Sequence, residues 1–305
     1  MNNTIRQFPW PGGARCAVAF TFDMDADSFL HQGRPGDSYR RIAVTSELRF
    51  GPLEGVPRIL EMYRRFNLKQ SFFIPAWCIE QYPHTVESIL KDGHEIGHHG
   101  YIHEHPNELD KGEERHWLRR GIEIIEAHTG QRPRGFRAPL YNFSESTLNL
   151  LLEERFTYDA SLMGHELPYL IRSPGGSMLE LPSHWTLDDW PPYVHISDIN
   201  FMMPIMSPAT AVAGFREDFD AAWEDGGLWV AVWHPFVTGR RARIRAVDGL
   251  IRHMMDKGDV WFATMEEIAA HVQSMVDSGA VSLPVDDIPY YSEKVQYERY
   301  KADER

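Results

Sequence analysis

The feature that most constrains the fold is a series of short apolar runs of strand-forming residues, separated by helical patterns. Residues 14–22 (ARCAVAFTF) and 228–233 (LWVAVW) are almost continuously apolar. Such runs are typical of parallel strands that are buried on both faces. Helical periodicity appears between runs of this kind, for example over residues 55–66 and 108–129. Strands that alternate with helices predict an α/β fold with a parallel sheet.

The remaining pattern completes about seven strand–helix units, which suit a closed or nearly closed (β/α) barrel. Further strands are predicted at 70–74, 135–138, 158–161, 179–181 and 260–263, and further helices at 83–92, 144–154, 208–224, 242–257 and 265–278. Residues 28–54 are expected to form a long loop, and residues 183–206 are rich in loops, aromatics and proline. No linker divides the 305 residues, so we predict one domain with an N-terminal arm and a C-terminal tail.

The composition limits the partners and the compartment. A formal net charge of -13 argues against nucleic acid and against an anionic membrane surface. The sequence has no run long enough for a transmembrane helix, and residues 1–13 lack the features of a secretory signal. Two cysteines, Cys16 and Cys78, fit a reducing cytoplasm better than a disulfide framework, and we expect each to be buried.

Residues 94–106 (HEIGHHGYIHEHP) form a histidine-rich stretch. If the stretch forms a helical turn, the i, i+4 spacing places His99 and His103 on one face. Such a pair can occupy two positions of a divalent metal and leave others open for catalysis. The alternative is a polar surface turn. His98 and His105 are expected to face elsewhere, either behind the metal ligands or, as the favoured alternative, towards solvent.

Two aspartates follow the first predicted strand. Asp23 and Asp25 lie at i and i+2, so both carboxylates can face one pocket while the strand lasts. One can bind a metal and the other can act as a base towards the water of that metal. With His99 and His103 they complete a two-histidine, one-carboxylate set that suits zinc, iron, manganese, cobalt or nickel. Without the histidines, a solvated acidic turn would be the better explanation of Asp23 and Asp25.

Three further groups are candidates for catalysis. His234 follows the strand at 228–233 and could protonate a leaving nitrogen, although a core histidine is an equal alternative. Asp188 and Asp189 could orient and charge this histidine, unless they are a solvated loop pair. Arg137 could pair with Asp23 and hold it ionised, unless its ion pair is only structural.

Five motifs in chain order resemble those of the polysaccharide deacetylase superfamily, whose members share the NodB homology domain. They are TFDMD at 21–25, HGYIH at 99–103, RAP at 137–139, WTLDDW at 185–190 and WHP at 233–235. One such motif is a weak signal, whereas five in order are a strong one. The resemblance covers roughly residues 15–270 and implies a distorted, NodB-like (β/α) barrel with fewer than eight strands.

The resemblance implies a role for each of seven residues. Three would bind a divalent metal, most often zinc: Asp25, His99 and His103. Four would serve catalysis: Asp23 as general base, His234 as general acid, Arg137 beside Asp23, and Asp189 beside His234. The implied reaction is hydrolysis of a carbon–nitrogen bond that is not a peptide bond.

The sequence departs from the secreted, sugar-acting members of this superfamily. Met24 separates two aspartates that are usually adjacent, and Leu140 stands where an aromatic residue usually lies beside the substrate. The DMD at 23–25, the long loop before GVPRIL at 55–60 and the WTLDDWPP stretch at 185–192 resemble an intracellular branch instead. That branch includes a peptidoglycan deacetylase of Helicobacter type, cyclic imide hydrolases and cofactor-free allantoinases. Those allantoinases lack the full ligand set, which is present here, so a metal is expected.

The substrate is expected to be a small amide, an imide or an N-acetylated sugar. The aromatic residues Trp185, Trp190 and Tyr193 would narrow a cleft, and a cytoplasmic location disfavours an insoluble polymer. Two other classes remain as alternatives: a non-catalytic binding protein on this scaffold, and a metal-dependent sugar isomerase. The isomerase would require more carboxylate ligands and a lysine near the metal.

We also expect a homo-oligomer. The tail contains more tyrosine than a free tail needs, at Tyr290, Tyr291, Tyr297 and Tyr300. Tyrosine is enriched at interfaces because it adds contact area and one hydrogen bond. The intracellular relatives commonly assemble as tetramers, which the resemblance extends to this chain.

Overall fold

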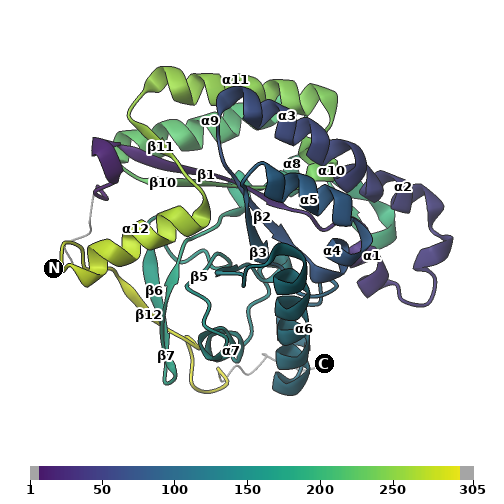
Figure 1. The fold of residues 1–305 in the computed structure, drawn as a ribbon, viewed down its shortest axis with the longest axis horizontal. Helices are drawn as coiled ribbons and strands as arrows, with labels where there is room; N and C mark the ends of the chain where they lie inside the picture. Colours follow the sequence, from purple (N-terminus) through teal and green to yellow (C-terminus); the bar gives the residue numbers. More distant parts are fainter. Residues whose placement is uncertain (1–6, 296–305) are drawn as a thin grey trace, which may run out of the picture.

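Seven parallel strands organise the chain in a computed structural model, which describes residues 7–295 (Figure 1). Their order across the sheet is β10 (Leu228–Trp233), β1 (Cys16–Asp23), β2 (Ser71–Ile74), β3 (Glu95–His98), β4 (Gly135–Phe136), β5 (Tyr158–Asp159) and β7 (Gly176–Glu180). Every neighbouring pair in this series is parallel. The predicted α/β fold with about seven parallel strands is confirmed.

The edges of this sheet are less regular. β6 (Tyr169–Ser173) pairs antiparallel with β7, β12 (Val285–Asp287) continues the sheet beyond β6, and β11 (Val260–Phe262) pairs with the start of β1. Between the segment after β7 and strand β10, the pairing found within residues 7–295 is one parallel bridge, Asp188 to Val232. The distorted barrel therefore has an interruption in its pairing, which we call the seam.

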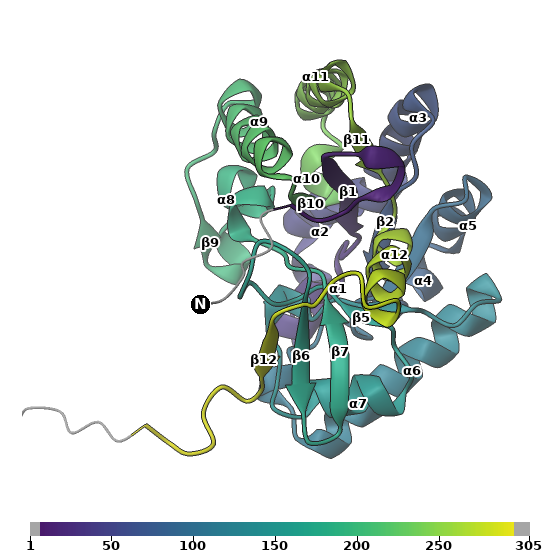
Figure 2. The ribbon, with the colours of Figure 1, turned by 90° about the vertical axis from the view of Figure 1, so that its left-hand side faces the viewer.

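Helices cover the sheet in groups that are visible in both ribbon views (Figures 1 and 2). α3 (Val56–Phe66), α9 (Pro208–Asp225) and α11 (Arg241–Lys257) pack together beside β1 and β10. α4 (Ala76–Gln81), α5 (Pro83–Lys91) and α6 (Lys111–Thr129) cover β2 and β3, while α7 (Thr147–Glu153) lies against β6 and β7. α12 (Met265–Asp277) packs on β1. Helix α4 was not predicted, whereas the other helices that cover strands agree with the predicted ones to within a few residues.

Local signals explain where these elements form. All eight residues of β1 are buried, as expected for a strand of a covered parallel sheet. The ring of Phe20 lies 5.4 Å from that of Trp229 and 5.2 Å from that of Tyr63, so it joins β1 to β10 and α3. Helix α6 begins with a capping box between Asp110 and Glu113, which satisfies amide groups of its first turn.

The predicted long loop over 28–54 is wrong. It contains α1 (Ser28–Gly33), α2 (Ile42–Phe50) and a wide turn at Gly51–Gly55. Both helices are short, and the glycines and polar residues around them gave the segment the composition of a loop. Val44 and Leu48 pack in a separate apolar cluster with α8 (Trp190–Tyr193) and α10 (Pro235–Thr238). This cluster, which includes the β8–β9 hairpin (His195–Ile196 and Phe201–Met202), borders the carboxyl ends of the strands.

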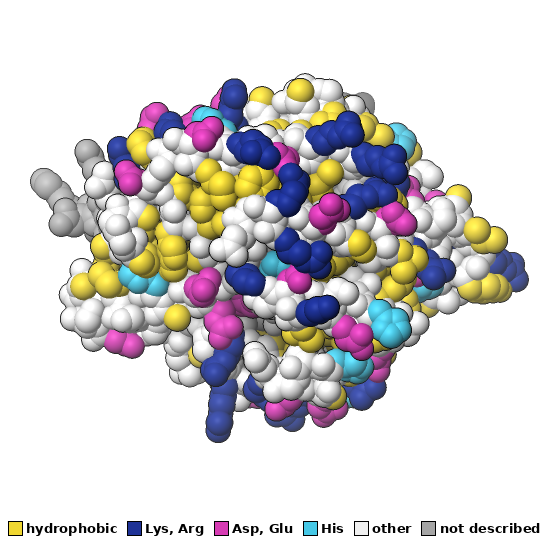
Figure 3. All heavy atoms as spheres, turned by 45° about the horizontal axis from the view of Figure 1, so that its top comes forward, with side chains coloured by type: hydrophobic (Ala, Val, Ile, Leu, Met, Phe, Trp, Pro, Cys, Tyr) yellow, Lys and Arg dark blue, Asp and Glu magenta, His cyan; other side chains and the backbone are white. Residues whose placement is uncertain are grey.

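Three further observations concern the surface charges, the two cysteines and the length of the helices. Figure 3 shows Lys and Arg side chains among acidic and apolar ones on one face, and Arg65 of α3 pairs with Asp248 of α11 at 2.7 Å. Cys16 and Cys78 are both buried free thiols, as predicted. None of the helices in the described part of the chain is both long and apolar enough to span a bilayer.

Candidate active site

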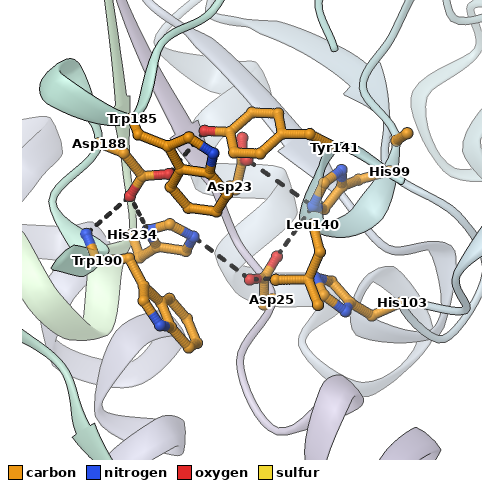
Figure 4. Close-up of a pocket in the computed structure, with 11 residues that line it drawn as sticks. Asp23, Asp25, His99, His103, Leu140, Tyr141, Trp185, Asp188, Trp190 and His234 are labelled. Carbon is orange, nitrogen blue, oxygen red and sulfur yellow. Dashed lines mark hydrogen bonds and ion pairs between the residues drawn. The ribbon is translucent and has the colours of Figure 1, made fainter. Parts of the chain in front are cut away.

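The candidate residues meet at the carboxyl ends of the parallel strands (Figure 4). Asp23 is the last residue of β1, and Asp25 follows it in the next loop. His99 comes directly after β3, and His234 directly after β10. Because parallel strands end at the same edge of a sheet, residues more than 200 positions apart line one pocket. Arg137, two positions after Gly135 of β4, lies against its wall.

Asp25, His99 and His103 form a compact set of buried donors. Asp25 Oδ1 lies 3.4 Å from His99 Nε2, and Asp25 Oδ2 lies 3.5 Å from His103 Nε2. One donor atom from each residue falls within 4.8 Å of the others. Asp25 Oδ1 is buried and accepts no hydrogen bond. Two imidazole nitrogens and one carboxylate are donors that zinc and related divalent ions prefer, so the set fits such an ion.

The helical turn predicted for this stretch is wrong, although its two histidines do converge. Residues 99–103 form a loop after β3. The ring centroids of His99 and His103 lie 5.2 Å apart. His103 has a backbone φ of 66°, in the left-handed region that non-glycine residues seldom adopt. The convergence therefore comes from a tight loop and not from the periodicity of a helix.

The ring of His99 is held in one tautomer. Its Nδ1 lies 2.7 Å from the carbonyl oxygen of Arg137, which can only accept a hydrogen bond. Nδ1 therefore carries the proton and donates it, which leaves Nε2 facing Asp25 as a donor for a metal. Burial lowers the pKa of His99, but the nearby Asp23 and Asp25 carboxylates outweigh it and raise the pKa overall.

Asp23 is paired with a fully buried guanidinium. Arg137 Nη1 donates to Asp23 Oδ1 at 2.6 Å and to Thr21 Oγ1 at 2.8 Å, and Nε donates to the carbonyl of Ala160 at 3.0 Å. The guanidinium carbon also lies 4.2 Å from the centre of the Phe73 ring. These contacts fix the arginine, which in turn holds the Asp23 carboxylate in place through a charge-assisted hydrogen bond.

His234 and Asp189 form a second buried pair. Asp189 Oδ1 accepts from His234 Nδ1 at 2.7 Å, and Oδ2 accepts from Thr238 Oγ1 at 2.6 Å. Burial lowers the pKa of His234, but the hydrogen bond and charge of Asp189, followed by Asp188 and Asp25, raise it to about 10. His234 Nε2 then faces the pocket, 3.6 Å from Asp25 Oδ2. Asp188 and Asp189 are both buried, unlike a solvated loop pair.

Tyr141 is a pocket residue that was not identified from the sequence, whereas its neighbours Trp185, Asp188 and Trp190 were. The Tyr141 hydroxyl donates to Asp188 Oδ2 at 2.6 Å, and its ring packs edge-on against Trp185. Trp190 packs at 5.0 Å from the ring of His234. Tyr141 lies close to a motif that was recognised, which was the available signal. Burial raises the pKa of Asp188 to about 7, and the adjacent Asp189 adds to this effect.

The solvent-facing position expected for His98 is wrong. Its side chain is completely buried, and Nε2 donates to the carbonyl oxygen of Leu118 at 3.1 Å, while Nδ1 accepts from the amide of Gly100 at 3.1 Å. His98 thus ties the histidine loop to helix α6. The last position of a buried strand, and not a helix face, explains why its imidazole points inwards.

Comparisons with known proteins agree with this architecture. The family model for polysaccharide deacetylases matches residues 43–158. A peptidoglycan deacetylase of Helicobacter pylori is 29% identical over 283 residues, which cover 83% of this chain and 94% of that protein. The solved structure of Puue allantoinase has a TM-score of 0.76 at 23% identity, with 90% of this chain and 94% of that one covered. At this identity the allantoinase likeness concerns the fold alone.

A second solved structure shows to which family this chain belongs. A Mycobacterium smegmatis protein assigned as a polysaccharide deacetylase is 38% identical, with a TM-score of 0.86. The match covers 96% of this chain and 98% of that one, which is nearly the whole length of both. The chain therefore belongs to the polysaccharide deacetylase family and is a hydrolase of carbon–nitrogen bonds other than peptide bonds.

Proposed function

We propose that this hydrolase is metal-dependent and acts on a small amide, by N-deacetylation or by opening a cyclic amide or imide. The observation that carries the proposal is the pocket itself. It combines a ligand trio with an aspartate–arginine pair and an aspartate–histidine pair, whose nearest polar atoms lie 3.8 and 3.6 Å from those of the trio. Amide hydrolysis needs these three elements: an electrophilic aid, a base for water and an acid for nitrogen.

Asp25, His99 and His103 would hold the divalent ion. Zinc suits this donor set first, and iron, manganese, cobalt and nickel accept the same donors. When bound, the ion polarises the substrate carbonyl and lowers the pKa of a water molecule. The His99 tautomer described above and the free Oδ1 of Asp25 both support this assignment.

Asp23 would act as the general base. Its Oδ1 is occupied by Arg137, so its Oδ2 remains to take a proton from the attacking water. Oδ2 lies 3.8 Å from His99 Nε2, which places it beside the ligand trio without belonging to it. Arg137 keeps the carboxylate oriented, because it is itself held by Thr21 and Ala160.

His234 would act as the general acid. Asp189 occupies Nδ1, so the proton available to the substrate is the one on Nε2, which faces the pocket. With its pKa raised to about 10, His234 is protonated at neutral pH. It can therefore donate to the nitrogen as the carbon–nitrogen bond breaks, which gives a carboxylic acid and an amine.

The pocket walls support a small substrate. Leu140, Tyr141, Trp185 and Trp190 line the pocket beside the polar groups. The hydrogen bond from Tyr141 to Asp188 links the loop after β4 to the loop before α8, so it joins two walls. This joining disfavours a cleft that is open at both ends, which a polymer would need.

A substrate panel tests the proposal. The value of kcat/KM would be compared for succinimide, hydantoin, allantoin, N-acetylglucosamine and chitin oligomers, with Zn²⁺ supplied. We expect at least one small amide, imide or single sugar to be hydrolysed faster than any oligomer. Faster turnover of a chitin oligomer than of every small compound would refute the closed pocket. The isomerase alternative gains no support, since none of the described pocket-lining residues is lysine.

The proposal also covers the oligomeric state and the cellular location of the protein. Tyr290 and Tyr291 are 58% and 74% exposed, which is consistent with a tail that packs on another copy of the chain. Tyr297 and Tyr300, which were part of that expectation, lie outside the described residues. We propose a cytoplasmic homo-oligomer, with a tetramer as the expected form.

A further inference from the structure

The loop between the two histidines is held by one carboxylate that has no assigned role. Glu104 Oε1 accepts from the amide of Tyr101 at 2.8 Å, and Oε2 accepts from the amides of Tyr101 and Ile102 at 3.0 and 2.8 Å. The Glu104 side chain turns back over the loop, and the residue is only 8% exposed. Two amides that no strand or helix could satisfy therefore find their acceptor in this side chain.

The other side of the same loop is attached to helix α4. The carbonyl oxygen of Gly100 accepts from the amide of Ala76 at 3.0 Å, and that of Tyr101 accepts from the amide of Trp77 at 2.8 Å. The loop is thus fixed from two sides, by α4 through its carbonyls and by Glu104 through its amides. Glu104 is the only side chain among the described residues that accepts from these two amides.

The backbone shows why such fixation matters. His103 has a φ of 66° and Gly100 a φ of 75°, both in the left-handed region. A Cβ atom on Gly100 would lie 3.0 Å from Glu104 Oε1, so a glycine stands where the carboxylate approaches most closely. A non-glycine residue in this region persists only where its surroundings hold it there.

We propose that Glu104 is a positioning residue that sets the separation of the His99 and His103 imidazoles, so that both face Asp25. This inference rests on the metal site proposed above. Groups that orient metal ligands typically change metal affinity by about 10- to 100-fold when they are replaced. Glu104 acts on the backbone between the two ligands and does not touch the substrate pocket.

Glu104→Gln is the central test. The amide keeps the size of the side chain but replaces one acceptor oxygen with an NH₂ group, which faces an amide donor. Zn²⁺ dissociation constants would be measured by competition with a chromogenic chelator, for the parent, Glu104→Gln and Glu104→Asp. Glu108→Gln is the matched control, since Glu108 lies on the same segment with a side chain that is 66% exposed.

We expect Glu104→Gln to weaken Zn²⁺ binding by about 10- to 100-fold, and Glu108→Gln to leave it unchanged. Glu104→Asp keeps both oxygens and should recover part of the affinity. At saturating Zn²⁺, KM should match that of the parent, and the absorption spectrum of the Co²⁺-loaded variant should differ from that of the parent. A purely structural role would lower the melting temperature without moving the dissociation constant or the spectrum.

The outcomes separate this inference from the proposed function. If the parent binds Zn²⁺ no better than His103→Ala does, the metal site itself is wrong. If the parent binds Zn²⁺ and both Glu104 variants bind it with the parent's affinity, Glu104 has no positioning role. Should Glu104→Gln fail to fold, the affinity of the shorter Glu104→Asp decides: a value equal to the parent's would overturn the inference.

Discussion

The hydrogen bond between Asp189 and His234 leads to a prediction about the pH dependence of turnover. The two groups are buried, and Asp189 Oδ1 accepts from His234 Nδ1 at 2.7 Å. Burial alone lowers the pKa of His234, whereas Asp189 is the largest influence that raises it. Asp189→Asn removes the charge, keeps the size of the side chain and leaves an oxygen that can still accept from Nδ1.

The structure gives the size of the effect. The pKa of His234 rises from 6.5 to about 10. This difference corresponds to about 5 kcal/mol, at about 1.36 kcal/mol for each pH unit. One opposite charge at about 4 Å contributes about 4 kcal/mol at an effective dielectric constant of about 20, which is about 3 pH units. We therefore expect the alkaline limb of the kcat profile to move down by about 2–3 pH units in Asp189→Asn.

The assay is a profile of kcat against pH for the parent and the variant, at saturating Zn²⁺ and with the best substrate of the panel. Thr238→Val is the matched control, because it removes a hydroxyl that donates to Asp189 but keeps the charge. Its alkaline limb should stay close to that of the parent. If the limb of Asp189→Asn coincides with that of the parent, the charge of Asp189 does not set the proton affinity of His234.

The same pair makes stability depend on pH. Because the pKa of His234 in the folded protein lies above its unfolded value of 6.5, the charged form is stabilised by folding. This contribution is complete below pH 6.5 and is lost as the pH rises through about 10. Asp189→Asn should therefore lower the free energy of unfolding more at pH 6 than at pH 10. An equal loss at both values would contradict this account.

Four further predictions concern metal, base, core and assembly. His103→Ala should lose the roughly one Zn²⁺ per chain that elemental analysis finds in the parent, and equal metal contents would exclude this ligand. Asp23→Asn should keep the metal but lower kcat by about 10²- to 10⁴-fold, whereas metal loss here with retention in Asp25→Asn would exchange the two roles. Phe20→Ala should lower the free energy of unfolding in urea by about 3–5 kcal/mol, since its ring joins three elements of the core. Light scattering at micromolar concentration should give the mass of an oligomer, and a monomeric mass would refute the proposed assembly.

The fold could be predicted where the sequence carried strong local signals. The strands β1 and β10 are continuous apolar runs, and the predicted and observed limits of β10 coincide. Strand β3 was missed because Glu95–His98 contains one large apolar residue and is short. Helices α1 and α2 were missed for a different reason: both are short, and their apolar residues pack on another loop region, which the local sequence does not reveal.

The sequence predicted which polar residues form the pocket, but not how the backbone arranges them. The spacing of Asp23 and Asp25 and the ordered motifs identified residues that the structure places together. The link between Tyr141 and Asp188 spans 47 positions and depends on two consecutive left-handed residues, Leu140 and Tyr141. No periodicity in the sequence predicts such a turn. For the same reason the left-handed His103 was mistaken for part of a helix.

The seam in the strand pairing has a consequence for how activity can be lost. Its one bridge joins Asp188 to Val232, and the adjacent amide of Asp189 donates to the Val232 carbonyl at 3.1 Å. The groups that orient His234 thus occupy a place where the barrel has little strand pairing. Opening there would separate His234 from its carboxylate while β1 to β5 remain paired. The rate of hydrogen exchange at the Asp189 amide would then measure a reversible loss of activity that occurs before the fold itself is lost.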